Sequence, residues 1–151
     1  EICACLVGSE MCIRDRSHHM AYLYNWTDSP WKGQGYLDYI MQNFYTNEPD
    51  GIIGNEDCGQ MSAWYVMSAL GFYQVSPGIP VYTLGRPMVN KASMHVKGGF
   101  FEIVATNNSP ANKYVKEVKL NGKVLETPFI SHSDIINGGK LEFIMTDQPV
   151  K

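Results

Sequence analysis

The sequence predicts an α+β protein in which a helical half precedes a β half. The helical half is indicated by apolar residues that recur at helical spacing between Gln34 and Tyr45. The β half is indicated by alternation of polar and apolar residues from Phe101 to Ala105. It is also indicated by Asn121-Gly122, a dipeptide typical of a two-residue hairpin turn. We place the boundary between the halves near Pro77 to Pro80.

Two helices are predicted in the first half, and a shorter helical turn over His19 to Tyr24 precedes them. The first helix, residues 34 to 45, should bury one side. Its apolar stripe consists of Leu37, Ile40, Met41 and Phe44. The second helix, from about Gly59 to Leu70, is apolar over much of its circumference, so we expect it to be well buried. Gly71 is suited to end that helix.

A loop rich in turn residues, from Asn47 to Asn55, joins the two helices. Asp57 stands just before the second helix. A carboxylate in that place can accept hydrogen bonds from free backbone N–H groups and meets the positive end of the helix dipole. Loops that present polar groups at a helix start are frequent places for function.

The second half should form strands joined by polar turns. Residues 114–120 and 123–125 flank the hairpin dipeptide, and a further strand, residues 140–145, follows the turn Asn137-Gly138-Gly139. We therefore expect a small antiparallel β region over residues 79–151.

Composition excludes some classes of function. With 151 residues the chain can hold one domain of common size, and its formal charge is −3. This charge gives no basic field, so we expect no nucleic-acid partner. The longest apolar runs are too short for a membrane-spanning segment. Aromatic residues gather at 22–45 and 64–73, where they either pack a core or form a surface that stacks on sugar rings.

Residues 1–16 look foreign to the rest of the chain. They show neither a helical nor a strand period, and residues 6–15 resemble the conceptual translation of a common transposase sequencing adapter. We therefore expect an unstructured assembly artefact and a native chain that begins near Ser17. The alternatives are an unusual N-terminal extension, or a metal or redox motif built from Cys3, Cys5 and Cys12. The absence of any Cys-x-x-Cys pair argues against the metal motif.

The densest polar group is the run Asn55-Glu56-Asp57 together with Gln60. Glycoside hydrolysis needs two carboxyl groups across the scissile bond, roughly 6.5–9.5 Å apart in an inverting enzyme. Adjacent residues such as Glu56 and Asp57 would share one side of the sugar, so this run can supply only one partner. The structural alternative is a plain helix cap beside a solvated Glu56.

Several motifs together resemble glycoside hydrolase family 92 in order and spacing, over Ser17 to about Met145. The first half contributes residues 18–25, Pro30-Trp31, Pro49-Asp50-Gly51, residues 54–65 and Gly71-Phe72-Tyr73. The second half contributes Asn107-Asn108-Ser109, residues 120–123 and Ile130-Ser131-His132. The run from Gly54 to Tyr65 is the most specific of them.

This resemblance implies a calcium-dependent, inverting exo-α-mannosidase that hydrolyses terminal α-mannosyl linkages of glycans such as N-glycans or mannans. Residues 17–78 would be the C-terminal helices of an (α/α)6 catalytic barrel. The rest of the parent enzyme, including an N-terminal β-sandwich and the catalytic acid, would lie upstream, so we expect this chain alone to be inactive. By analogy with relatives, the parent would be an exported bacterial enzyme, at the cell surface, in the periplasm or secreted.

The resemblance also suggests roles for particular residues. Asp57 would be the general base, and Glu56 and Asn55 would position the base or the attacking water. Calcium would bind hydroxyls of the cleaved mannose and help distort its ring, with ligands that the sequence leaves unknown. Substrate contacts would come from Asn55, Gln60 and Trp31, and from the pair His18 and His19. Core packing for Trp31, and a structural role or a cloning tag for the histidine pair, are the alternatives.

The sequence departs from the family pattern in two places. Arg14-Asp15-Arg16 stands where the family usually carries Gly-Asn-Glu-Pro, and Ile53 stands where it often has Pro. We expect structural roles for His95 and His132. Two other functions stay open, namely a carbohydrate-binding module without hydrolysis and a structural or interaction domain without a ligand.

Overall fold

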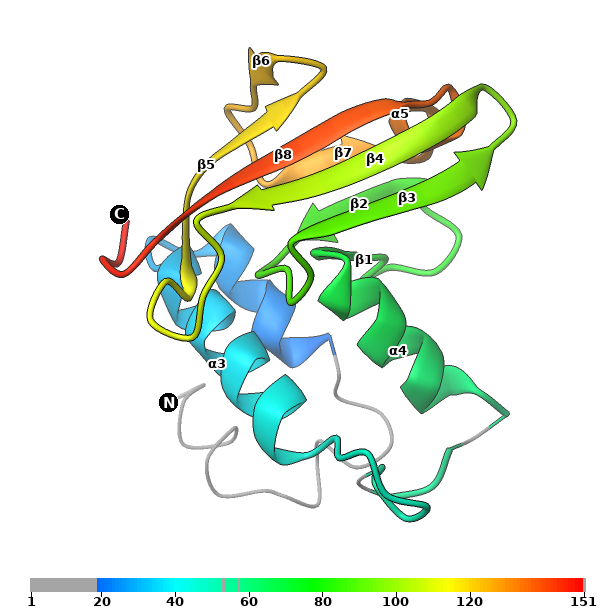
Figure 1. The fold of residues 1–151 in the computed structure, drawn as a ribbon, viewed down its shortest axis with the longest axis vertical. Helices are drawn as coiled ribbons and strands as arrows, with labels where there is room; N and C mark the ends of the chain where they lie inside the picture. The colour runs from blue at the N-terminus through cyan, green and yellow to red at the C-terminus, as the bar shows by residue number, and fades with distance from the viewer. Residues whose placement is uncertain (1–18, 53, 57, 151) are drawn as a thin grey trace.

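The structure, a computed structural model, describes residues 19–52, 54–56 and 58–150. A helical part lies on one side of two β-sheets (Figure 1). Its elements are the 3₁₀ helix η1 (Met20–Trp26) and the α-helices α3 (Pro30–Asn43) and α4 (Gln60–Ala69). Helices η1 and α4 run in the same direction and α3 runs opposite to them (Figure 1). The predicted α+β class is confirmed.

The helices form close to the predicted positions, but α3 begins at Pro30, before the predicted start at Gln34, and ends at Asn43, before the predicted end at Tyr45. Pro30 occupies the start of α3, where a missing N–H costs nothing. The predicted stripe of α3 is buried at Leu37, Ile40 and Met41. Gly71 ends α4 with a φ of 96°, a conformation that glycine adopts without strain. Among the described residues, no helix combines the length and apolar character needed to cross a bilayer.

The expectation that α4 is well buried is wrong. The helix buries Met61 and Trp64, but Ala63 and Val66 are exposed on the other side, Val66 by 55%. Burial of all sides needs neighbours on every side, and the described residues pack against only part of the helix circumference.

The strands form two sheets. The three-stranded sheet has the order β1 (Phe72–Tyr73), β2 (Val81–Leu84), β7 (Phe129–Ser131), and both pairs are antiparallel. The five-stranded sheet has the order β3 (Lys91–Val96), β4 (Gly99–Thr106), β8 (Gly139–Thr146), β5 (Tyr114–Leu120), β6 (Lys123–Val124). The short helix α5 (His132–Ile136) lies between β7 and β8 in the chain.

The prediction of a purely antiparallel region is wrong at one pair of strands. β4 and β8 are parallel, with Phe101 opposite Gly139 and Thr106 opposite Ile144. The intervening β5, β6, β7 and α5 return the chain to the end of the sheet where β4 began. The predicted hairpin is confirmed, because Asn121 and Gly122 take φ values of 51° and 82° between the antiparallel strands β5 and β6.

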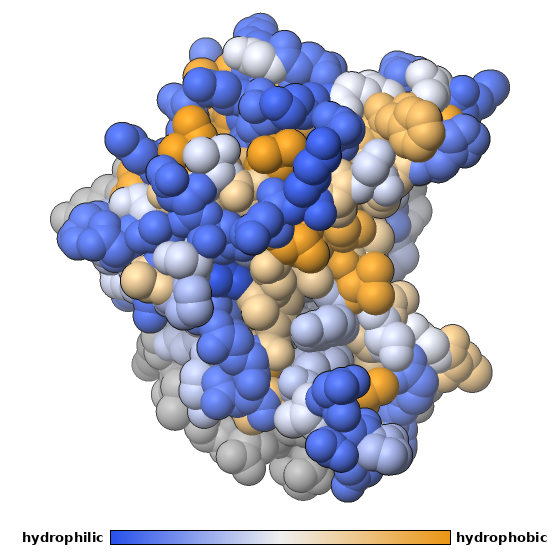
Figure 2. Space-filling view, in the orientation of Figure 1, coloured by the Kyte–Doolittle hydropathy of each residue, from blue (hydrophilic) through white to orange (hydrophobic). Residues whose placement is uncertain are grey.

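Among the described residues, two large apolar clusters form most of the core, and a small third one surrounds Tyr24. In the first, alternate residues of β4 and β8, including Phe101 and Phe143, pack against residues of the three-stranded sheet such as Phe72. The second is smaller and lies among the helices, around Tyr22 and Trp64. Over the outer face of the five-stranded sheet the surface is mostly polar, whereas apolar surface gathers where sheets and helices meet (Figure 2).

Candidate active site

The loop between α3 and α4 is held by a few backbone contacts. Tyr45 and Ile52 form an isolated β-bridge. Inside it, the Thr46 N–H donates to the Gly51 carbonyl over 2.8 Å, and the Gly51 N–H donates to the Glu48 carbonyl over 2.9 Å. A Cβ at Gly51 would overlap the Thr46 carbonyl oxygen, so only glycine fits this turn. The loop therefore has a defined shape between the two ends of the bridge.

Glu56 caps the N-terminus of α4. The residue at the N-cap position is Gly59, with a φ of 89° and no side chain to accept a hydrogen bond. Instead, Glu56 Oε1 accepts from the Ser62 backbone N–H over 3.1 Å. The Glu56 carbonyl oxygen also accepts from the Met61 N–H over 3.3 Å. A negative carboxylate at the positive end of the helix is electrostatically favourable.

The other carboxylate oxygen of Glu56 is buried without a partner. Oε2 is inaccessible to solvent and accepts no hydrogen bond from the residues that the structure describes. A buried carboxylate oxygen in this state is costly unless a ligand, ion or water satisfies it. The solvated Glu56 of the plain-cap alternative is therefore not what the structure shows.

Aromatic rings cluster near the start of α4, and one of them, Tyr45, lies close enough to Glu56 to feel its charge. Tyr45 stacks on Tyr65 with ring centroids 4.7 Å apart, and on Trp64 at 5.8 Å. Burial raises the pKa of Tyr45, and the negative charge of Glu56 raises it further. The phenol of Tyr45 therefore stays protonated near neutral pH and remains a hydrogen-bond donor.

A hollow of about 360 Å³ opens beside these rings. Tyr45 and Tyr65 form part of its wall together with Ser62, whose N–H binds Glu56. Its volume is near the lower end for small-molecule sites, roughly 300–1,000 Å³. The rest of its wall consists of Thr46, Asn47, Gly51, Ile52 and Val66.

The structure brings together only some of the residues that the sequence singled out. Asn55 and Glu56 lie just before α4, and Gln60 is its first residue. His19 stands at the start of η1, whose N-terminal end faces the same side of the helical part as the start of α4 (Figure 1). Asp57, the predicted base, lies outside the described residues.

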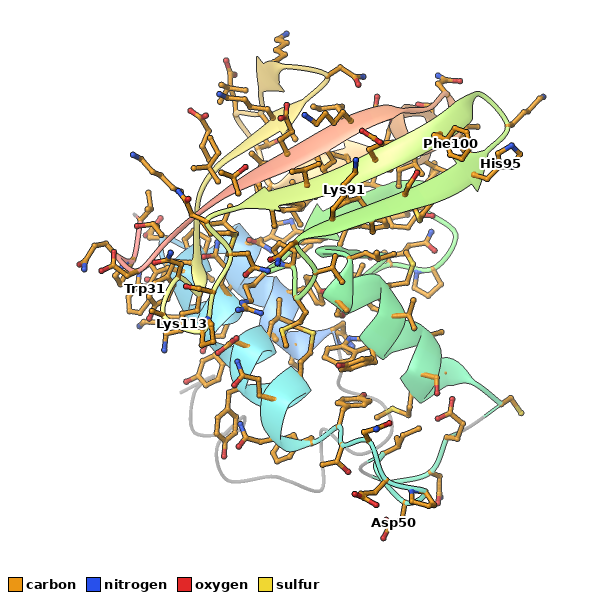
Figure 3. All side chains as sticks on the ribbon, viewed as in Figure 1. Trp31, Asp50, Lys91, His95, Phe100 and Lys113 are labelled. Atoms are coloured by element: carbon orange, nitrogen blue, oxygen red, sulfur yellow. The ribbon has the colours of Figure 1, made fainter. Side chains whose placement is uncertain are left out.

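Other predicted residues lie elsewhere or outside the description. His18 and Ile53 are not among the described residues. Trp31 lies at the opposite end of α3 from the loop, far from Asp50 in Figure 3. In the β part, His95 contacts the ring of Phe100, and His132 Nδ1 lies 3.1 Å from the Tyr82 hydroxyl.

The wall formed by Tyr45, Ser62 and Tyr65 was not predicted from the sequence. A signal for it exists, because Ser62 and Tyr65 stand three residues apart on one helix and therefore share a face. Tyr45 directly follows the apolar stripe of α3. The aromatic clustering identified the region but not the residues.

The predicted calcium site stays a prediction. The described residues contain no group of three or more His, Cys, Asp or Glu side chains able to hold a metal ion. Calcium takes six to eight oxygen ligands. Glu56 Oε2 fits as one of them, because it is a buried, unpartnered carboxylate oxygen. The remaining ligands would have to come from outside the described residues.

Comparisons with known proteins agree on one family. The model of the glycosyl hydrolase family 92 catalytic domain matches residues 13–147. The solved structure of a family GH92 α-mannosidase from Bacteroides thetaiotaomicron is 44% identical with a TM-score of 0.83, covering 87% of this chain and 18% of that chain. Its complex with mannoimidazole matches with 43% identity and a TM-score of 0.84, over 88% and 18%.

Two further relatives extend the comparison. A family GH92 inverting mannosidase from the same bacterium is 37% identical with a TM-score of 0.82, over 89% of this chain and 18% of that one. An uncharacterized secreted glycosidase from Arthroderma benhamiae is 27% identical over 128 residues, 82% of this chain and 16% of that protein. The chain thus spans less than a fifth of the length of these relatives.

Proposed function

Because this chain belongs to glycosyl hydrolase family 92, we propose that it forms one wall of the active site of an exo-α-mannosidase. The enzyme would hydrolyse terminal α-mannosyl linkages of glycans such as N-glycans or mannans. One observation carries the proposal. Glu56 caps α4 through the Ser62 N–H, and Ser62 lines an aromatic hollow, while the other carboxylate oxygen of Glu56 is buried without a partner among the described residues. The α-mannosidase relatives, one of them in complex with mannoimidazole, support mannose as the sugar.

In this proposal η1, α3 and α4 are the C-terminal helices of an (α/α)6 barrel. The N-terminal ends of η1 and α4, with the loop between α3 and α4, would face the substrate (Figure 1). The parent enzyme would be exported, in keeping with the relative described as a secreted glycosidase. The bacterial relatives suggest a bacterial parent.

The proposed chemistry is inversion, as in the relative described as an inverting mannosidase. Asp57 would take a proton from the attacking water, and the catalytic acid would come from the remainder of the parent. Glu56 would act as a positioning residue, because its hydrogen bond from the Ser62 N–H fixes the chain next to Asp57. A chain with only one of the two carboxyl partners should not hydrolyse mannosides by itself.

Calcium would supply a hard cation that binds sugar hydroxyls and favours a distorted ring. Glu56 Oε2 would be one of its ligands, because this buried carboxylate oxygen accepts no hydrogen bond from the described residues. Asn55 and Gln60 stand on either side in the sequence and would contact the sugar.

The test compares two substitutions in the parent enzyme. Asp57→Asn should lower kcat on an α-mannoside by roughly 100-fold or more with little change in KM, because a general base contributes about 10²–10⁴-fold. The matched control Asp147→Asn, at an exposed carboxylate that follows β8, should leave kcat unchanged. An Asp57→Asn enzyme with normal kcat would overturn the assignment of the base. Hydrolysis by the 151-residue chain alone would overturn the proposal that the active site also needs residues from the rest of the parent enzyme.

A further inference from the structure

Trp31 and Tyr114 form an aromatic pair that joins the start of α3 to the start of β5. Their rings meet edge to face, with centroids 6.4 Å apart and planes at 79°. A hydrogen bond also joins α3 to β5, because the Val115 N–H donates to Gln34 Oε1 over 2.9 Å. Both rings remain partly exposed. They therefore form a fixed aromatic surface at the end of α3 away from Asp50 (Figure 3).

The ammonium group of a lysine lies over each ring of this pair. Lys32 Nζ lies 5.5 Å from the centroid of the Trp31 ring, and Lys113 Nζ lies 5.5 Å from that of Tyr114. The ion pairs found among the described residues use other cations, Arg86, Lys91, Lys119 and Lys140. No described carboxylate therefore lies within ion-pair distance of Lys32 or Lys113.

The acidic residue next to β8 does not neutralise this surface. Tyr114 pairs with Thr146, which brings Asp147 near the start of β5. The carboxylate of Asp147 accepts hydrogen bonds from the Gln148 side chain and the Thr146 hydroxyl instead. Two ammonium groups on one aromatic pair thus lack a carboxylate partner in the described part of the chain.

The start of α3 adds to the positive character. The Ser29 side chain makes no capping hydrogen bond, and the first turn contains no acidic residue. Within its first turn, where Trp31 and Lys32 stand, α3 therefore offers no carboxylate to the positive end of its dipole, and the exposed Asp28 stands just before the N-cap. Aromatic faces, two cations and an open helix start meet on one surface.

We propose that this surface, formed by Trp31, Lys32, Lys113 and Tyr114, binds an acidic saccharide. The apolar face of a pyranose ring would stack on the exposed aromatic surface, and its carboxylate or sulfate group would pair with the two lysines. A nucleic acid fits less well, because the chain has a net charge of −3 and this surface offers only two cations. The site goes beyond the proposed hydrolysis, since it lies at the other end of α3 from Glu56.

Binding of three polysaccharides to the full chain tests the proposal. Dextran sulfate supplies rings with sulfate, polymannuronate supplies rings with carboxylate, and dextran supplies neutral rings. We expect at least one of the two acidic polymers to bind at least 10-fold more tightly than dextran. The acidic polymer that binds identifies the anionic group. Equal binding of dextran, or no binding of either acidic polymer, would overturn the proposal.

Two double variants test whether binding depends on this particular surface or only on the general attraction between lysines and polyanions. Lys32→Gln/Lys113→Gln should weaken binding at least 10-fold. The control Lys97→Gln/Lys123→Gln removes the same charge at exposed lysines for which the structure shows no ring contact, and should weaken it less than twofold. Equal losses in the two double variants would show nonspecific attraction and would overturn the site.

The role of the ring is tested at Trp31. Trp31→Ala should lower affinity at least 10-fold, and Trp31→Phe should restore most of it because a stacking face returns. Circular dichroism of each variant checks that the fold is kept. If Trp31→Ala disturbs the fold, the Phe variant decides: a folded Trp31→Phe protein that binds no acidic polymer contradicts stacking.

Discussion

Arg86 Nε lies 3.2 Å from Asp38 Oδ1, in an ion pair that links the β part of the chain to α3. The Arg86 side chain is 4% exposed and that of Asp38 is 13% exposed. Burial lowers the pKa of Arg86, and the charge of Asp38 opposes that shift. Gln42 Nε2 also donates to Asp38 Oδ1, over 2.7 Å. The carboxylate therefore holds a buried guanidinium from one half and a side chain of its own helix.

Removing one member of this pair should destabilise the protein strongly. Asp38→Ala leaves the guanidinium of Arg86 buried and unpaired, and we expect a loss of about 3 kcal/mol in the free energy of unfolding. Urea unfolding followed by circular dichroism measures it. Asp50→Ala, at an exposed loop carboxylate, is the control and should change stability by less than ~0.5 kcal/mol. A loss below about 1 kcal/mol for Asp38→Ala would contradict the importance of the pair.

Alkaline pH should destabilise the protein through its buried tyrosines. Burial raises the pKa of Tyr22, Tyr45 and Tyr73. The unfolded chain ionises these phenols near pH 10, while the folded chain still binds their protons. Stability is therefore full below about pH 10 and falls as pH rises above it, by up to about 1.4 kcal/mol per pH unit for each tyrosine.

The comparison of the native chain with Tyr22→Phe isolates one tyrosine. The variant loses the 2.8 Å hydrogen bond from the Tyr22 hydroxyl to Ser68 Oγ, so it should be less stable at pH 8. Its stability should nevertheless fall less steeply than that of the native chain between pH 9.5 and 11.5. Urea midpoints across that range give the two slopes. Parallel slopes would show that Tyr22 does not take part.

Two glycine-to-alanine changes should act in opposite directions. Gly122 has a φ of 82° in the β5–β6 turn, so alanine there should cost about 1–2 kcal/mol. Gly35 lies inside α3, where a Cβ meets nothing within 4 Å. Alanine there should raise the free energy of unfolding by up to about 1 kcal/mol. Thermal and urea unfolding of both variants test the pair. A stabilising Gly122→Ala would mean that the turn does not require a positive φ.

The cap on α4 can be tested separately from catalysis. Glu56→Ala removes the acceptor of the Ser62 N–H and should cost about 1 kcal/mol in the free energy of unfolding. Glu56→Gln keeps an oxygen that can accept this hydrogen bond, so its loss should be smaller. Glu48→Ala, at an exposed side chain of the same loop, serves as the control. Equal stability of the Ala and Gln variants would argue against the cap.

Local features of the fold could be predicted because neighbouring residues determine them. The stripe of α3, the stop at Gly71 and the turn at Asn121-Gly122 each depend on a few adjacent residues. The parallel pairing of β4 with β8 could not be predicted in this way. Alternation in Phe101 to Ala105 shows which side is buried, but it does not choose a partner strand.

The candidate site could also be predicted only in its local features. The sequence located the polar run at the start of α4, and the structure finds Glu56 there as the capping residue. The position of Trp31 could not be inferred, because its neighbour Tyr114 stands 83 positions later in the chain (114 minus 31). Packing between distant segments decides such contacts, and no local pattern records it.

The place of β8 in the five-stranded sheet has a consequence for the order of synthesis. Of the described strands β8 is made last, yet it lies between β4 and β5. Until residues 139–146 leave the ribosome, we expect the strands of this sheet to pair only as two separate hairpins, β3–β4 and β5–β6, with open edges on both. A stop codon after residue 138 would therefore remove the strand that joins them, and we expect such a product to be unfolded and prone to aggregate.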